Sequence, residues 1–173
     1  MANWYMLTLV GEDRPGIVAK TTSVLFDAGC NLGEASMMRL GGNFTIMLMV
    51  EVPQATGALE SIVQPVADSL KLHYHIDTIQ AHLHQHLEPD VRITVHGADR
   101  AGIVSSVTSA LAAAGLHILD LTSDVGGTAD KPIYVMQIEG HAANGIEALE
   151  QSLQSIKQEG VKVSVHEIDT LLG

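Results

Sequence analysis

Residues 11 to 18 read GEDRPGIV and residues 97 to 104 read GADRAGIV, so the chain carries the same motif twice. At an offset of 86 residues, the first copy is identical to the second at Gly11, Asp13, Arg14, Gly16, Ile17, Val18, Thr22, Ser23, Leu25, Ala28 and Gly29. This density of identities indicates a duplicated unit, and a repeat of this kind constrains the fold more than any local pattern does. The 173 residues are therefore expected to form two small domains.

The offset between the copies changes further along the chain. Residues 44 to 47, FTIM, align with residues 133 to 136, IYVM, and residues 72 to 74 align with residues 161 to 163, both at an offset of 89. The second copy has thus gained about three residues between positions 123 and 133, where the sequence GGTADKP is rich in turn-forming residues. A hairpin tip tolerates such an insertion.

Each copy reads as strand, helix, strand, strand, helix, strand. Val91, Ile93 and Val95 alternate with polar residues, as in a strand with one buried face. Apolar residues at helical spacing follow each motif. Gly29 and Gly115 stand where these helices are expected to end, because a helix commonly stops at a residue that tolerates a left-handed backbone.

The second half of each copy predicts a hairpin and another helix. Residues 31 to 38 and 44 to 52 are joined by Gly41-Gly42-Asn43, which is a hairpin sequence. An apolar stripe from Leu59 to Leu70 predicts the helix. Pro65 lies within this stripe and lacks a backbone donor, so a break is expected near Val63.

A βαββαβ unit places both helices on one face of a four-stranded antiparallel sheet, which is the ferredoxin-like arrangement. The sequence therefore predicts an α+β protein with two such domains in tandem, at residues 1–81 and 90–173, joined by a linker at residues 82–89.

The other face of the first sheet is expected to be partly apolar. Met6 and Val10, and on a later strand Met47 and Met49, alternate with the residues that face the helices. A face of this kind is expected to be covered by the sister domain or by another subunit.

Composition excludes some classes of partner. A net charge of -11 argues against binding nucleic acid through its phosphates, which requires clustered Lys and Arg.

The first residues do not resemble a secretory signal, and the apolar run at residues 44–50 is far shorter than the ~20 residues that span a bilayer. The single cysteine, Cys30, cannot form an internal disulfide, which suits a reducing compartment. A soluble cytoplasmic protein without membrane contact is expected.

Three chemical interpretations of the repeated motif compete. A phosphate loop needs more glycine and a Lys before Ser or Thr, and a catalytic Asp13 needs a base, nucleophile or metal that the shared residues do not supply. Helix capping by Asp13 and Asp99, with Pro15 in the first turn, explains part of the motif. Gly16 and Gly102 would each cost up to about 1 kcal/mol inside a first helical turn, so they predict a close approach by backbone or by a small ligand.

The same turn has the chemistry to hold a free amino acid. The free N–H groups of a helix amino terminus attract a carboxylate, and an adjacent Asp can receive an ammonium group. One strand-to-helix turn can therefore bind both charged ends of a small zwitterion.

A strand, then DRPGIV opening a helix, then AGCNL leading into a strand resembles the ACT domain, a regulatory module that binds small molecules. Two such units without an enzyme domain resemble the glycine cleavage system transcriptional repressor family. The resemblance implies pairing of units into a larger sheet, a homo-oligomer, and amino-acid binding between units. It also implies a non-catalytic regulator that contacts a protein partner, such as a transcription activator, and does not hold DNA itself. The alternative is an interaction and assembly module with no ligand.

In ACT domains that bind serine-like ligands, the contacts come from the turn before the first helix and from a polar residue after that helix. The matching positions are Gly11, Asp13, Arg14, Gly16 and Asn31 in the first copy, and Gly97, Asp99, Arg100, Gly102 and His117 in the second. Ala101 replaces Pro15, and His117 differs from Asn31 in shape and charge, so the first copy is the better candidate site for an amino acid of the glycine or serine class. No catalytic residue, cofactor or metal ligand is expected.

A histidine cluster precedes the second copy. His82, His84 and His86 alternate, so on a strand they would share a face and could gather around zinc, copper or nickel. No cysteine accompanies them, and a polar linker or edge strand is the preferred interpretation, with metal binding left open. Cys30 has no cationic neighbour in sequence and is expected to pack near the helix end.

Overall fold

In the computed structural model, the chain divides into two compact units, Met1–Leu83 and His84–Gly173. The described residues are 3–53, 58–80, 87–98, 102–128 and 131–168. Most of the predicted linker, including His82, His84 and His86, lies outside these ranges.

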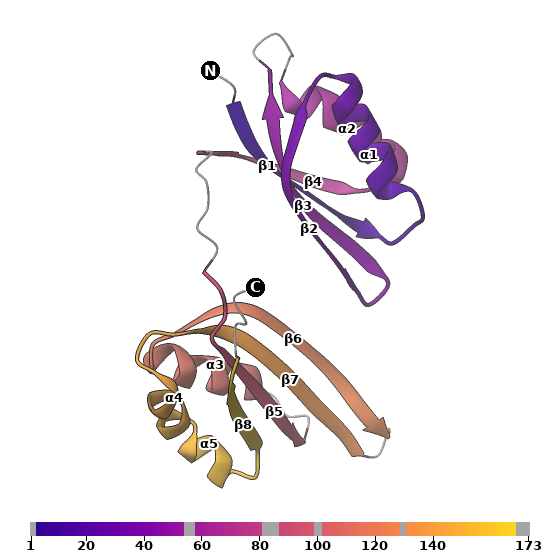
Figure 1. Cartoon of the computed structure of the whole chain (residues 1–173). Helices are drawn as coiled ribbons and strands as arrows, with labels where there is room; N and C mark the ends of the chain where they lie inside the picture. The colour runs from indigo at the N-terminus through magenta and orange to yellow at the C-terminus, as the bar shows by residue number, and fades with distance from the viewer. Residues whose placement is uncertain (1–2, 54–57, 81–86, 99–101, 129–130, 169–173) are drawn as a thin grey trace. The chain divides into compact units, whose positions relative to one another are not determined.

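The first unit contains one four-stranded antiparallel sheet with two helices on one face (Figure 1). Its elements are β1 (Asn3–Glu12), α1 (Ile17–Asp27), β2 (Asn31–Leu40), β3 (Asn43–Val52), α2 (Leu59–Leu70) and β4 (His73–Ile79). The strand order is β2-β3-β1-β4, so the first and third strands are central. This is the predicted ferredoxin-like arrangement.

The second unit repeats the arrangement with the strand order β6-β7-β5-β8. Its elements are β5 (Val91–Ala98), α3 (Ile103–Ala113), β6 (Leu116–Thr128), β7 (Lys131–Ala142), α4 (Ile146–Ser152), α5 (Gln154–Gln158) and β8 (Lys162–Glu167). The predicted pair of tandem α+β domains is thus confirmed. None of the helices in the described parts of the chain is long and apolar enough to cross a membrane.

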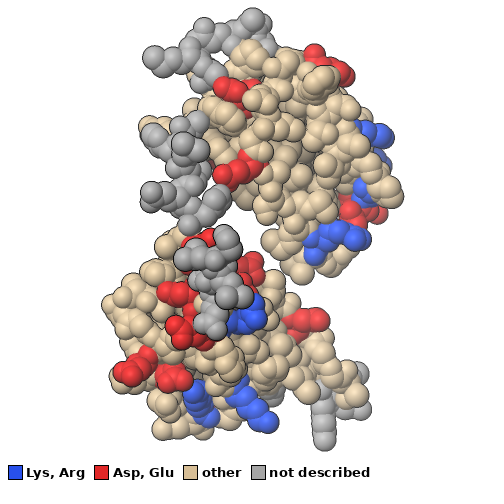
Figure 2. All heavy atoms as spheres, viewed as in Figure 1, with Lys and Arg blue, Asp and Glu red and all other residues tan. Residues whose placement is uncertain are grey.

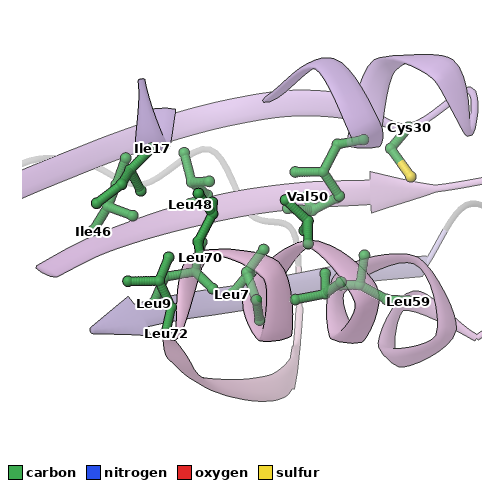
Figure 3. Close-up of a cluster of buried hydrophobic side chains, with 14 of the residues drawn as sticks. Leu7, Leu9, Ile17, Cys30, Ile46, Leu48, Val50, Leu59, Leu70 and Leu72 are labelled. Atoms are coloured by element: carbon green, nitrogen blue, oxygen red, sulfur yellow. The ribbon is translucent and has the colours of Figure 1, made fainter. Parts of the chain in front are cut away.

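Each unit has its own aliphatic core between sheet and helices. In the first, Leu7 and Leu9 of β1 are fully buried and lie among side chains from β3 and α2, as Figure 3 shows. In the second, Ile93 and Val95 hold the same positions. Burial of each such side chain contributes roughly 1.5–3 kcal/mol, so alternation along the central strands largely decides which face receives the helices.

The predicted helix ends are confirmed at both glycines. Gly29 has φ 77° and Gly115 has φ 88°. At the end of α1, the N–H of Gly29 donates to the Phe26 carbonyl at 2.8 Å, and the N–H of Cys30 donates to the Leu25 carbonyl at 2.9 Å. This pairing closes the helix and directs the chain into β2. Cys30 is buried there, as expected, and burial raises the pKa of its thiol.

The predicted hairpin between β2 and β3 is also confirmed. Gly41 and Gly42 have φ of 57° and 78°, so both central residues of the two-residue turn are left-handed. Such a turn matches the twist of the flanking strands and strongly favours glycine.

The strand register corrects the predicted alignment of the third strands by one residue. Ile46 lies opposite Leu9, and Met136 lies opposite Val95. Ile46 therefore corresponds to Met136 at an offset of 90 instead of 89, and the β6–β7 hairpin has gained four residues. A shift of one residue moves every side chain of a strand to the other face. Because residues 133 to 136 are apolar throughout, the sequence pattern could not decide between the two registers.

The predicted break at Pro65 is wrong, because α2 is continuous from Leu59 to Leu70. Proline has no backbone N–H, so Pro65 leaves the Ser61 carbonyl without its helical hydrogen bond. Both residues are exposed, so water can reach this carbonyl. Burial of Val63 and Val66 holds the other side of the helix. The helix that divides is its counterpart in the second domain, where Leu153 separates α4 from α5 without a proline.

Candidate functional site

The turn between β1 and α1 begins at Asp13, and α1 begins at Ile17. Gly16 is the residue before the helix and has φ 86°. A Cβ built on Gly16 would meet nothing within 4 Å, so the glycine is required by the backbone angle and not by a close neighbour. Gly102 has the same role before α3, with φ 88°.

The predicted helix cap is wrong for the first copy. Neither α1 nor α3 has a hydrogen bond from a capping side chain, and neither has an acidic residue in its first turn. Gly16 takes the capping position itself, which places Pro15 before the helix and leaves Asp13 too early to cap it. Asp99 lies outside the described residues. The first-turn amides of α1 therefore have no side-chain acceptor at the cap.

Asp13 instead connects the turn to the β2–β3 hairpin. Its backbone N–H donates to the Gly42 carbonyl at 3.0 Å, and its Oδ2 lies 2.6 Å from Nη2 of Arg39 on β2. The Asp13 side chain is mostly buried, whereas Arg39 is largely exposed. The carboxylate thus lies at the turn with one guanidinium already beside it.

A second ion pair flanks the first. Arg14 donates to the Glu12 carboxylate, and this hydrogen bond and the charge of Arg14 lower the pKa of Glu12. Two acids and two arginines thus lie at this turn in two ion pairs, so both signs of charge are available to a ligand with one positive and one negative end.

A recess of about 300 Å³ opens beside this turn. Its lining residues come from the turn, from the first residues of α1 and from β2 and β3: Asp13, Arg14, Gly16, Ile17, Val18, Ala19, Met37 and Phe44. Its volume is at the lower end of the range for small-ligand sites.

Gly11 and Gly97 have a packing role inside each domain. A Cβ on Gly11 would lie 2.6 Å from Leu72 Cδ2 and 3.2 Å from the Lys71 carbonyl oxygen. A Cβ on Gly97 would lie 3.2 Å from Ile103 Cδ1. The close backbone oxygen favours glycine at position 11, whereas a Cβ on Gly97 would require only a small shift of the Ile103 side chain. A ligand contact at either position stays a prediction.

Asn31 lies at the other end of α1, away from the recess. Its Nδ2 donates to Glu51 Oε2 at 3.3 Å, and its Oδ1 accepts from the Leu32 N–H at 3.1 Å. It lines a separate hollow of about 260 Å³. Because α1 has 11 residues, about 16 Å of helix separates its two ends. A single domain therefore does not bring Asn31 to Asp13.

The second copy differs from the first at the position that corresponds to Asn31. Arg100, like Asp99, lies outside the described residues. His117 lies on β6 opposite His141 of β7, and His141 Nδ1 lies 2.8 Å from Asp90 Oδ2. His117 and Asn31 thus hold equivalent strand positions, but His117 lies opposite a histidine whereas Asn31 lies opposite Glu51.

Sequence reasoning missed Arg39, Met37 and Phe44, because they come from strands distant in sequence from the motif. Comparison of the two copies could have pointed to Arg39, because the equivalent strand position in the second copy is the uncharged Val125. The described residues contain no group of three His, Cys, Asp or Glu side chains that could hold a metal ion.

Both units of the chain match a known domain family. A profile described as "ACT domain" matches residues 5–77 and again residues 90–166. The glycine cleavage system transcriptional repressor of Escherichia coli K12 is 28% identical over 122 residues, which are 70% of this chain and 64% of that protein. The chain thus matches slightly less than two thirds of that relative's length.

Two solved structures share the whole fold. A protein of unknown function from Galdieria sulphuraria superposes with a TM-score of 0.76 at 22% identity and covers 97% of this chain and 99% of its own. A protein provisionally described as a glycine cleavage system transcriptional repressor superposes with a TM-score of 0.71 at 18% identity, over 97% and 98% of the two chains. At these identities the likeness concerns the fold alone.

Proposed function

The chain belongs to the ACT domain family, and from that premise we propose that it is a non-catalytic regulatory protein that binds a small amino acid and acts through a protein partner. The similarity to a glycine cleavage system transcriptional repressor supports glycine cleavage as the regulated process. A transcription activator as the protein partner is part of the proposal. Cytoplasmic location is part of this proposal.

The observation that carries the proposal is the recess at the β1–α1 turn of the first domain. The uncapped first turn of α1 offers N–H groups and a partial positive charge to the ligand carboxylate. Asp13 offers a carboxylate to the ligand ammonium, which must compete there with Arg39. Met37 and Phe44 give the recess an apolar wall beside the charged residues.

In the proposed complex, Asn31 of a neighbouring unit contacts the ligand. Because the helix holds it about 16 Å from the turn, it can reach the ligand only if a second ACT unit presents it. Pairing of units, as the ACT resemblance implies, would complete each site with an amide that both donates and accepts. A homo-oligomer is therefore part of the proposed binding-competent form.

The ionisable side chains that line the recess are Asp13 and Arg14. Neither has a nucleophile or a general base beside it in the recess, and this supports binding without catalysis.

Calorimetric titration of the protein with each of the twenty amino acids tests the proposal. We expect binding of glycine or serine with a micromolar to millimolar Kd and a loss of at least tenfold in affinity for Asp13→Asn. Asp27→Asn, at the far end of α1, is the matched control and should bind as the wild type does. Indifference to all twenty amino acids would remove the sensor function.

An assembly module without a ligand is the second candidate, and the Asp13–Arg39 ion pair favours it because it gives Asp13 a structural task. The two candidates differ in a partner-capture experiment with and without glycine. If the protein is a sensor, the amount of protein partner that it captures should change when glycine is added. If it is an assembly module, the amount captured should be the same with and without glycine, and Asp13→Ala should not reduce it.

A further inference from the structure

Another hollow of the first domain lies beside β4 and the start of α2. Its volume is about 550 Å³, which is within the range of small-ligand sites. Three segments that are far apart in the sequence meet here: the start of β1, the first turn of α2 and the strand β4. We define the tyrosine hollow by its lining residues, Tyr5, Ala58, Leu59, Glu60, Tyr74, His75, Ile76 and Thr78.

The tyrosine hollow and the recess at the β1–α1 turn lie at opposite ends of the first domain. About 20 Å of β1 separates Tyr5 from Gly11, which directly precedes that turn. Helix α2 covers a similar distance, from Leu59 at the hollow to Leu70, and Leu72 just beyond it lies beside Gly11. The hollow is therefore separate from the proposed amino-acid site.

The Lys and Arg side chains of the first domain are remote from the tyrosine hollow. Residues 1–83 contain four of them, Arg14, Lys20, Arg39 and Lys71. Arg14 and Arg39 form the ion pairs of the β1–α1 turn, and Lys71 follows the last residue of α2. Lys20 lies one helical turn after Gly16, to whose carbonyl its N–H donates at 3.0 Å. Figure 2 shows the visible Lys and Arg side chains of this domain together on one side.

The tyrosine hollow has a negative charge. Glu60 is exposed in the first turn of α2, whose backbone contributes roughly half a positive charge, so the sum stays negative. Partial burial raises the pKa of the Tyr74 hydroxyl, and the negative charges of Glu60 and Asp68 raise it further. His75 is charged only when protonated, and Asp77 then offsets it, because His75 Nε2 lies 3.1 Å from Asp77 Oδ2. The hollow therefore favours a cation over an anion.

Two tyrosines add a second feature that suits a cation. The Tyr74 hydroxyl donates to Glu60 Oε1 at 3.4 Å, a long bond that leaves the carboxylate able to accept from a ligand. Tyr5 lies on the neighbouring strand, opposite Thr78 of β4. The face of a tyrosine ring attracts organic cations, and its hydroxyl can accept from their N–H groups.

The second domain shows that the fold does not need these tyrosines. Val91 and Val163 occupy the strand positions of Tyr5 and Tyr74. The acid in the first helical turn is present in both domains, as Glu147 of α4 in the second. The two aromatic side chains are therefore specific to the first domain, and packing of the sheet against the helices does not account for them.

We propose that the tyrosine hollow binds a primary alkylammonium group, with Glu60 accepting from its N–H groups and the rings of Tyr5 and Tyr74 beside its carbon chain. A primary ammonium has three donors, and the hollow offers three kinds of acceptor in the Glu60 carboxylate and the hydroxyls of Tyr74 and Thr78. A free amine and the lysine side chain of a protein partner both present this group.

Nuclear magnetic resonance titration of the full chain with n-butylammonium chloride tests the proposal, with sodium chloride at equal concentration as the reference. We expect a Kd in the low millimolar range and amide shift changes concentrated at residues 58–60 and 74–78. Glu60→Gln should raise this Kd at least tenfold, because a charged hydrogen-bond acceptor is lost. Glu147→Gln, the matched control in the second domain, should leave it unchanged.

The contribution of the aromatic ring is tested by Tyr74→Val, which introduces the residue that the second domain carries at this place. It should raise the Kd for butylammonium at least threefold. Far-ultraviolet circular dichroism should stay as in the wild type, because the same fold already accommodates valine there. n-Butanol, which has the same carbon chain without the charge, should bind at least tenfold more weakly than butylammonium.

The source of the ammonium group is distinguished with Nα-acetyl-lysine methylamide, which presents it as a protein side chain does. Binding at least as tight as that of butylammonium would assign the hollow to a lysine of a protein partner, and weaker binding would assign it to a free amine. Butylammonium that causes no shift changes up to about 100 mM would overturn the proposal. Binding that n-butanol matches, or that Glu60→Gln leaves unchanged, would overturn it as well.

Discussion

Met6 and Met49 of the first domain occupy the place in the sheet that Arg92 and Glu139 occupy in the second. The strand order, the buried central strands and the left-handed glycine before the first helix are the same in both domains. The residues on the sheet faces away from the helices are different, and Val125 of the second domain takes the place of Arg39, which lies beside the first turn. The shared features are those that the core and the backbone require, so the differences indicate where each domain meets its surroundings.

The largest expected effect concerns a glycine that only the second domain has. Gly140 takes the place of the buried Val50, and a Cβ there would lie 2.4 Å from the His117 carbonyl oxygen. Gly140→Val should destabilise the second domain by about 3 kcal/mol, because backbone atoms must move. Hydrogen exchange, followed by mass spectrometry for each domain separately, measures this.

The mirror variant Val50→Ala should cost the first domain about 2 kcal/mol through lost apolar burial and leave the second unchanged. A cost below about 1 kcal/mol for Gly140→Val would show that the β6–β7 hairpin accommodates valine at this position as the β2–β3 hairpin does.

The second helices offer the next test. Pro65→Ala should stabilise the first domain by about 1–2 kcal/mol, because alanine restores a hydrogen bond within the continuous helix α2, partly offset by the freer unfolded chain. Urea unfolding measures the change. A stability of Pro65→Ala equal to or below that of the wild type would indicate that the Ser61 carbonyl gains nothing from an amide partner in α2.

A smaller effect is expected at Thr21, whose buried hydroxyl has no hydrogen-bond partner among the described residues. The second domain has Val107 at this position, also buried. Thr21→Val should stabilise the first domain by about 1 kcal/mol, because an unsatisfied polar atom is removed at constant shape. Thermal unfolding of this variant and of Val107→Thr should show shifts of opposite sign, and a loss of stability in both would indicate that the Thr21 hydroxyl has a partner.

The smallest effect on stability is expected at the turn. Arg39→Val introduces the residue that the second domain carries at this place, Val125, and should change the free energy of unfolding by less than about 0.5 kcal/mol, because the ion pair with Asp13 is partly exposed. The same variant should bind the amino acid a few-fold more tightly, since Asp13 no longer has a competing cation. Calorimetric titration checks this, and weaker binding would indicate that Arg39 itself contacts the ligand carboxylate.

Much of the fold could be predicted because it rests on short-range patterns that occur twice. The period of two in Val91, Ile93 and Val95 and the glycines at the helix ends depend on backbone geometry and burial alone. The offset of the third strands was predicted one residue short, because an entirely apolar run has no alternation to set its register.

The site was harder to predict because its parts come from distant segments. Asp13 has the residue type of a helix cap, yet its carboxylate lies beside Arg39, 26 residues further along the chain. Pro65 has the residue type of a helix breaker, yet its exposed position lets water satisfy the freed carbonyl. In both cases a local preference is overridden by surroundings that no local pattern describes.

The sequence by itself determined the duplication, the order of strands and helices, the side of each central strand that is buried, and the ACT character of the repeated motif. These follow from residue spacing, which acts through the chain's own geometry. Only the tertiary structure decided that Gly16 is required by its backbone angle, that Asp13 pairs with Arg39, and that Asn31 lies a helix length from the turn. Those outcomes depend on which segments fold against each other, and that is set by the packing of the whole domain.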